Sequence, residues 1–179
     1  SFVPRVALAL AVSLPASAAE VKLLSSVPPN LASGTASGAS RVAALSADGR
    51  WVLFSSEAPN LLPGIVDENG VNDVFLHDRI TGETILVSQS VEDETRTAGN
   101  LSTGTSISAD GRFVVFVSLA SDLVPGQVDV GGWDFFLYER VTGRTELISH
   151  KRGARTSAAN GGFGGAVITP YFDSLLVKV

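Results

Sequence analysis

The sequence predicts an all-β fold, and three observations support this. A pattern returns about every 62 residues, because the segment 46–50, Ser-Ala-Asp-Gly-Arg, recurs unchanged at 108–112. Each copy holds four short apolar runs, and residues typical of turns separate one run from the next. The second run of each copy is apolar on both pleat faces, as in a strand covered on both sides. The predicted fold class is an incomplete β-propeller, with about two four-stranded antiparallel blades plus one N-terminal closing strand.

Residues 41–103 are predicted to form the first blade. Asp48-Gly49 gives the first hairpin turn, because glycine accepts a positive φ and aspartate binds its own backbone. A long loop at 57–72 follows the second strand, and Thr81-Gly82 forms the last turn. The four predicted strands are 41–46, 51–55, 73–78 and 84–88.

Residues 104–158 are predicted to form the second blade. Asp110-Gly111 and Thr142-Gly143 repeat the two tight turns of the first copy. The strands that follow the first turn are predicted at 113–117, 134–139 and 145–149. Blades stack face to face, so a single blade cannot bury its apolar surfaces alone.

Residues 1–19 are predicted to be a secretory signal peptide. Arg5 precedes an apolar stretch at 6–14, and Ala16-Ser17-Ala18 is a small-residue cleavage motif. The stretch is shorter than the roughly 20 residues that span a bilayer, so we expect no membrane span after signal removal. The alternative interpretation is an N-terminal core strand or helix. We expect a periplasmic or secreted bacterial protein.

Residues 20–40 are predicted to hold one strand and a Gly/Ser-rich loop. Leu23-Leu24-Ser25 lines up with Leu86-Val87-Ser88 and with Leu147-Ile148-Ser149, which end the two copies. The strand at 21–25 therefore corresponds to the last strand of a blade. Circular propellers often close in this way, so we expect the chain to come from the front of a longer propeller.

The repeat also carries a family resemblance. The pattern Ser-Ala-Asp-Gly-Arg-aromatic-Val-x-Phe resembles the WD40-like propeller repeat of TolB-type bacterial proteins, as do Asn60-Leu-Leu-Pro-Gly, Asp73-Val-Phe and Thr81-Gly-Glu-Thr. The resemblance covers about residues 21–150. Such propellers serve as partner platforms, enzyme accessory domains and ligand sites, so the resemblance implies a fold and no single activity.

Residues 159–179 break the pattern. Thr169-Pro-Tyr-Phe stands where Ser-Ala-Asp-Gly is expected, and the stretch 164–179 resembles a piece of the biotin carboxylase domain of pyruvate carboxylase. One interpretation is a joined reading frame, and the other is a diverged third blade whose next strand is 175–179. Neither brings an enzyme, because a strand-sized piece lacks the ATP-grasp body.

Composition argues against several functions. The net charge of −5 argues against a nucleic-acid partner, and the absence of cysteine excludes disulfides, thiolate zinc sites and a cysteine nucleophile. Of the two histidines, His77 falls within a predicted strand and His150 ends one. No Gly-x-Ser-x-Gly elbow is present. We therefore expect no catalytic residues and no enzymatic activity.

Asp67, Asn69 and Asp73 are candidate calcium ligands. Closely spaced carboxylate and amide oxygens are the ligands that Ca²⁺ prefers, and Gly70 permits a sharp turn between them. The alternative is ordinary turn chemistry, in which these side chains cap backbone groups. No other cofactor is expected.

The leading functional hypothesis is an exported, non-enzymatic propeller that offers a scaffold to a protein partner or a ligand. One alternative is the accessory propeller of an exported hydrolase or peptidase whose catalytic module lies beyond this chain. Another is a calcium-stabilised structural repeat. Two stacked blades would leave two broad apolar faces exposed, so self-association through these faces is also expected.

Overall fold

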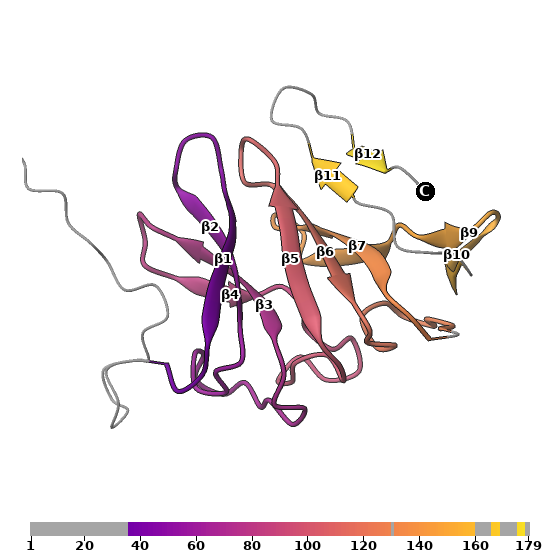
Figure 1. Ribbon diagram of the computed structural model, residues 1–179, viewed down its shortest axis with the longest axis horizontal. Helices are drawn as coiled ribbons and strands as arrows, with labels where there is room; N and C mark the ends of the chain where they lie inside the picture. The colour runs from indigo at the N-terminus through magenta and orange to yellow at the C-terminus, as the bar shows by residue number, and fades with distance from the viewer. Residues whose placement is uncertain (1–35, 130, 160–165, 169–174, 178–179) are drawn as a thin grey trace, which may run out of the picture.

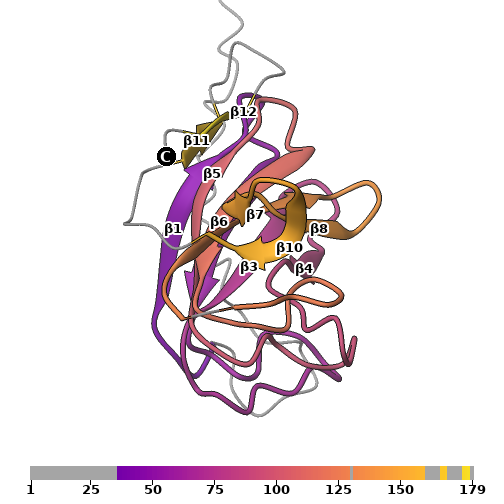
Figure 2. The same cartoon turned by 90° about the vertical axis from the view of Figure 1, so that its right-hand side faces the viewer.

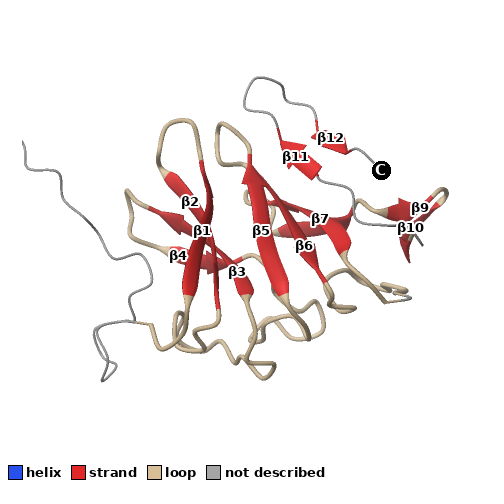
Figure 3. Cartoon of the chain, viewed as in Figure 1, coloured by secondary structure: helices blue, strands red, loops and turns tan. Residues whose placement is uncertain are grey.

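The computed structural model describes residues 36–129, 131–159, 166–168 and 175–177. Within these ranges every regular element is a strand and none is a helix (Figure 3), so the all-β prediction is confirmed. The strands form two four-stranded sheets and two two-stranded ladders. The predicted signal peptide at 1–19 and the closing strand at 21–25 lie outside the described residues.

The two four-stranded sheets stand side by side (Figure 1), and each runs in simple sequence order with antiparallel neighbours. The first contains β1 (Ser40–Leu45), β2 (Trp51–Ser56), β3 (Asp73–Asp78) and β4 (Thr84–Leu86). The second contains β5 (Ser102–Ile107), β6 (Phe113–Ser118), β7 (Asp134–Glu139) and β8 (Arg144–Leu147). The strand bounds predicted from the sequence agree with these to within two residues.

Two short ladders follow the second sheet. The first pairs β9 (His150–Lys151) with β10 (Ala154–Ala158), lies next to β8 and faces the viewer in Figure 2. The second pairs β11 (Ala166–Ile168) with β12 (Leu175–Val177). β11 lies beside β5 and β6. β12 covers part of the strand predicted at 175–179, while the resemblance of this tail to a carboxylase stays a prediction.

The repeated Ser-Ala-Asp-Gly-Arg segment closes the first hairpin of each sheet. Ser46 Oγ donates to Asp48 Oδ1 at 2.6 Å and accepts a hydrogen bond from the Trp51 amide at 2.9 Å. Asp48 Oδ1 also accepts from the Arg50 amide at 3.0 Å, and Gly49 has a φ of 69°. The turn at Ser108 makes the equivalent bonds. The serine and aspartate therefore satisfy the turn's own backbone, which explains why this motif favours a hairpin.

Arginine ties the same turn to the third strand. Arg50 binds Asp78 through two nitrogens, with Nη2 to Oδ2 at 2.6 Å, and this contact holds the pKa of Asp78 well below its usual range. Arg112 binds Glu139 in the equivalent place in the second sheet. Each sheet thus carries the same link between the turn after its first strand and the end of its third strand.

One apolar core lies between the two sheets. The face of the first sheet that carries Leu53 and Leu76 packs against the face of the second sheet that carries Phe116 and Phe136. All four side chains are fully buried. Because one buried apolar side chain stabilises a fold by about 1.5–3 kcal/mol, this shared core holds the two sheets together.

The faces that meet in this core are not equivalent. Phe116 and Phe136 correspond in the repeat to Phe54 and Phe75, and both pairs stack, with ring centroids 5.3 Å and 5.5 Å apart. Phe54 lies on the face of the first sheet opposite to Leu53, because neighbouring residues in a strand alternate sides. The contact between the sheets is therefore head-to-tail, and the same face of each sheet points in the same direction along the stack.

The two Asp-Gly turns reinforce the head-to-tail contact. The Ala47 amide donates to the Ala109 carbonyl at 3.0 Å. The guanidinium carbon of Arg140 lies 4.0 Å from the centroid of the Trp51 ring, within the range of a cation–π contact. Gly111 lies so close to Trp51 that a Cβ atom there would be 2.2 Å from Cδ1 of the ring. The second sheet thus needs glycine at this position to approach the first.

The central strands of the outer apolar faces are covered, so the expectation of broad exposed faces is wrong there, whereas Val42 of β1, which pairs with Phe54 and shares its face, is 61% exposed. Phe54 and Phe75 are 2% and 3% exposed, because Ala58 and Leu61 of the long loop after β2 pack over them. On the outer face of the second sheet, Val115 is fully buried. Self-association stays a prediction.

Within the described ranges, no helix is long and apolar enough to cross a bilayer.

The close approach of Gly111 to Trp51 gives a stability prediction. Gly49 and Gly111 occupy equivalent turns and share a φ of 69°, but a Cβ at Gly49 would meet nothing closer than 3.5 Å. Both Gly→Ala variants should lose about 1–2 kcal/mol from backbone strain. Gly111→Ala should lose about 1–3 kcal/mol more, because it forces Trp51 to move. Urea unfolding followed by circular dichroism measures both, and equal losses would contradict the packing of the turns.

Candidate functional site

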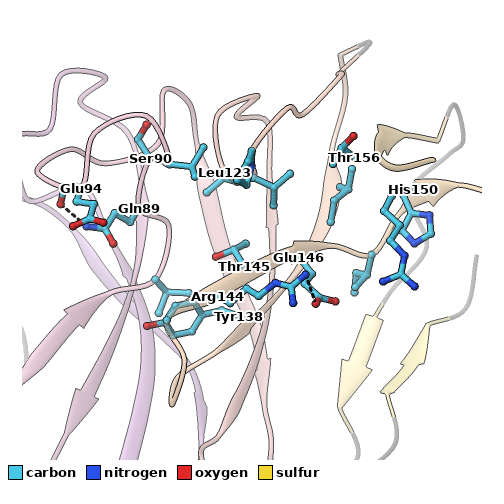
Figure 4. A pocket seen from close by; sticks show the side chains of 18 residues that line it. Gln89, Ser90, Glu94, Leu123, Tyr138, Arg144, Thr145, Glu146, His150 and Thr156 are labelled. Atoms are coloured by element: carbon cyan, nitrogen blue, oxygen red, sulfur yellow. Dashed lines mark hydrogen bonds and ion pairs between the residues drawn. The ribbon is translucent and has the colours of Figure 1, made fainter. Parts of the chain in front are cut away.

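A cavity of about 720 Å³ opens between the outer parts of the two sheets, and we call it the cleft (Figure 4). Its volume is typical of a site for a small molecule or a short peptide segment. One wall is formed after β4 by Val87, the segment 89–91 and Glu94, and the other is β8 with its flanking residues. The loop 123–125 and the residues His150, Arg155 and Thr156 complete the lining.

The cleft exists because the sheets diverge outward. β1, β2 and β3 all approach β5, whereas β4 and β8 do not come comparably close to each other. The floor of the cleft is the outer end of the shared core, where Val87, Leu123 and Leu147 are buried. Tyr138 also lines the cleft, and burial raises the pKa of its hydroxyl. The floor can therefore hold apolar groups.

Charged and polar groups surround this apolar floor. Arg144 and Glu146 of β8 form an ion pair with an N–O distance of 3.2 Å. Nδ1 of His150 lies 3.0 Å from the Lys151 carbonyl oxygen, which can only accept, so Nδ1 carries the proton of that bond. Glu94 lies on the opposite wall, where its carbonyl accepts a hydrogen bond from the Gln89 side chain.

Two equivalent hairpins border the cleft, the acidic hairpin at 89–97 and the basic hairpin at 150–158. An antiparallel bridge from Gln89 to Thr97 closes the first, and the equivalent pairing of His150 with Ala158 closes the second, where Lys151 also pairs with Ala154. Each is also held by the long loop of its own sheet through a parallel bridge. The names reflect their composition, because the acidic hairpin has three acidic residues and one arginine, while the basic hairpin has three basic residues and no acidic one.

The predicted calcium ligands all bind groups of the protein. Asp67 Oδ1 accepts hydrogen bonds from the amides of Asn69 and Gly70 at 3.1 Å and 2.9 Å. Asn69 accepts from the Val71 amide and donates to the Ala98 carbonyl. Among the described residues, no group of three or more Asp, Glu, His or Cys side chains is arranged to hold a metal ion. The calcium site stays a prediction, and the observed bonds are those of the turn-chemistry alternative.

Asp73 is a buried carboxyl at the start of β3. It is 1% exposed and accepts a hydrogen bond from Ser88 Oγ at 2.9 Å. Ser88 Oγ in turn accepts from the Val74 amide, so the pair ties the end of β4 to the start of β3. The pKa of Asp73 is raised to about 7, mainly by burial and in smaller part by the nearby Asp67 carboxylate, while the hydrogen bond from Ser88 acts in the opposite direction.

The second sheet repeats this link with Asp134 and Ser149, whose oxygens lie 2.7 Å apart. Burial raises the pKa of Asp134 as well. Because both sheets contain the same Asp–Ser link, we interpret it as a structural feature of the sheet. His77 is likewise buried in β3, with Nδ1 2.9 Å from Thr84 Oγ1, where a substrate could not reach it.

The sequence did not reveal the cleft. Its lining comes from segments that follow the strands, and the acidic and basic hairpins differ too much in composition for the repeat to be recognised there. The opposite charges of the two hairpins were visible, but only the structure places both beside one cavity.

Comparisons of the chain with protein-family models, with curated proteins and with solved structures give no match.

The raised pKa of Asp73 gives a pH prediction. Its folded pKa of about 7 exceeds the ordinary value of 3.8, so the folded state binds this proton more tightly than the unfolded state does. The resulting stability is present below about pH 4 and is lost as the pH rises through 7. Asp73→Asn should flatten this decline by an amount on the order of 4 kcal/mol.

Urea unfolding at a series of pH values tests this expectation. Asp134→Asn is the matched control, and it should flatten the curve less because Asp134 is less deeply buried than Asp73. An unchanged pH dependence in Asp73→Asn would show that Asp73 ionises freely in the folded protein.

Proposed function

We propose that this chain is an exported, non-enzymatic segment of a β-propeller of the WD40-like kind, which binds a partner or ligand at the cleft. The observation that carries the propeller proposal is the head-to-tail packing of two four-stranded sheets. Contacts between non-equivalent faces can repeat indefinitely, and they close into a ring when the rotation between units allows it. A two-sheet sandwich with two-fold symmetry would instead bring equivalent faces together.

The position of β11 adds support. β5 lies beside β1 and β2 of the preceding sheet, and β11 lies beside β5 and β6 in the corresponding way. β11 then pairs with the strand that follows it, as β5 pairs with β6. This arrangement suits a third unit that continues the stack, which is how a propeller grows.

The chemistry of the cleft supports binding more than catalysis. The Arg144 and Glu146 side chains neutralise each other, and the His150 Nδ1 proton is engaged by a backbone carbonyl. A general base needs to reach both its substrate and an orienting partner. An apolar floor with charged groups around it is typical of a recognition site.

The proposal that the protein is exported rests on its N-terminal sequence and can be tested separately. Residues 1–40 fused to an alkaline phosphatase that lacks its signal should give phosphatase activity in the periplasm of a bacterial host. Leu8→Asp combined with Leu10→Asp interrupts the apolar stretch, so this variant should abolish the activity. Equal activity from both fusions would contradict export by this segment.

Site-specific photocrosslinking tests binding at the cleft. A photoreactive phenylalanine analogue is placed at Val91, which is exposed and lines the cleft, in the full chain expressed in its native host. The matched control carries the analogue at Val42, which is exposed on β1 and outside the cleft lining. The proposal predicts a discrete adduct at Val91 and none at Val42. The absence of an adduct at Val91 would contradict it.

A further inference from the structure

β8 is an edge strand with free backbone groups. Among the described residues it is the last strand of the second sheet, and there it pairs only with β7. The Ile148 amide donates to the Phe135 carbonyl at 2.9 Å, and the register between β7 and β8 has no shift. In an antiparallel pair, alternate residues point their N–H and C=O groups toward the partner. Thr145 and Leu147 therefore point theirs to the open side.

This open edge borders the cleft. Every residue from 143 to 148 lines the cavity, so β8 contributes one unbroken wall (Figure 4). The floor beside it is apolar, with Leu147 and Val124 buried. An added strand pairs its backbone with the edge and places alternate side chains on opposite faces. The cleft thus offers an extended peptide both hydrogen bonds and a place for its apolar side chains.

Charge distinguishes the two sides of the cleft. Arg155 lines it next to His150, and Lys151 and Arg152 lie in the same hairpin. Among the described residues, none of these three basic side chains forms an ion pair with a carboxylate. The basic hairpin is therefore a cluster of positive charge on a chain whose net charge is −5. Such a cluster attracts a segment with carboxylates.

The acidic groups of the cleft set the orientation of such a segment. Glu146 is paired with Arg144, so its charge is compensated. Glu94 lies on the opposite wall in the acidic hairpin and repels carboxylates. The acidic side chains of a bound peptide therefore belong at the basic hairpin, away from Glu94.

We propose that the cleft binds an extended acidic peptide segment of a partner protein, which adds to β8 as a fifth antiparallel or parallel strand with its carboxylates at the basic hairpin. This inference rests on the proposed scaffold function and specifies the chemistry of the partner. Backbone pairing supplies affinity without regard to sequence, and Arg155 with its neighbours supplies the preference for acidic side chains.

The test uses the full chain and a labelled peptide of about eight residues in which glutamate and valine alternate. Fluorescence anisotropy should show binding that weakens with added salt. A peptide with lysine in place of glutamate should not bind. Arg155→Glu should weaken binding roughly tenfold, and Glu94→Gln should strengthen it by roughly two- to fivefold. Arg41→Glu, the same charge change outside the cleft, should leave the affinity unchanged.

Hydrogen exchange separates strand addition from charge attraction alone. Bound peptide should slow exchange at the amides of Thr145 and Leu147 and leave Glu146, which already faces β7, unchanged. Binding without this protection, or equal binding of the lysine peptide, would overturn the proposal. If one of these contrary results is found together with a photocrosslinked adduct at Val91, the partner is not an acidic peptide strand and the proposed scaffold function stands. If the adduct is also absent, both proposals fail.

Discussion

The packing of one sheet face against the opposite face of the next sheet is the constraint on which the rest of this structure depends. The Leu53 face of the first sheet must meet the Phe116 face of the second. Because these faces differ, each sheet needs two apolar faces, which is why β2 and β6 are apolar at consecutive positions. A sheet with one polar face could not occupy the middle of such a stack.

The same constraint explains the repeated motif and the cleft. The turn with Gly111 must approach the preceding sheet closely, so it is built as a tight hairpin that satisfies its own polar groups and has no side chain against Trp51. With the inner strands held together there, the natural twist of each sheet carries the outer strands apart. β4 and β8 consequently diverge, and the space between them is the cleft.

The strands could be predicted from the sequence, because two copies of one pattern report the same turns twice and each Asp-Gly or Thr-Gly pair fixes a hairpin. The covered outer face could not, because it depends on how the loop with Ala58 and Leu61 folds back over Phe54. The roles of Asp67 and Asn69 were ambiguous, since the same oxygens serve metals and turn amides. The cleft depends on hairpins that share geometry and little sequence, so no pattern in the chain marks it.

Head-to-tail packing is the central claim, and nuclear Overhauser effects measured in solution test it most directly. The account predicts contacts between the indole protons of Trp51 and the α-protons of Gly111, with Gly111 shifted by the ring current. It predicts none between the rings of Phe54 and Phe116, which lie on separate cores. Contacts between Phe54 and Phe116, without those between Trp51 and Gly111, would place equivalent faces together and contradict the account.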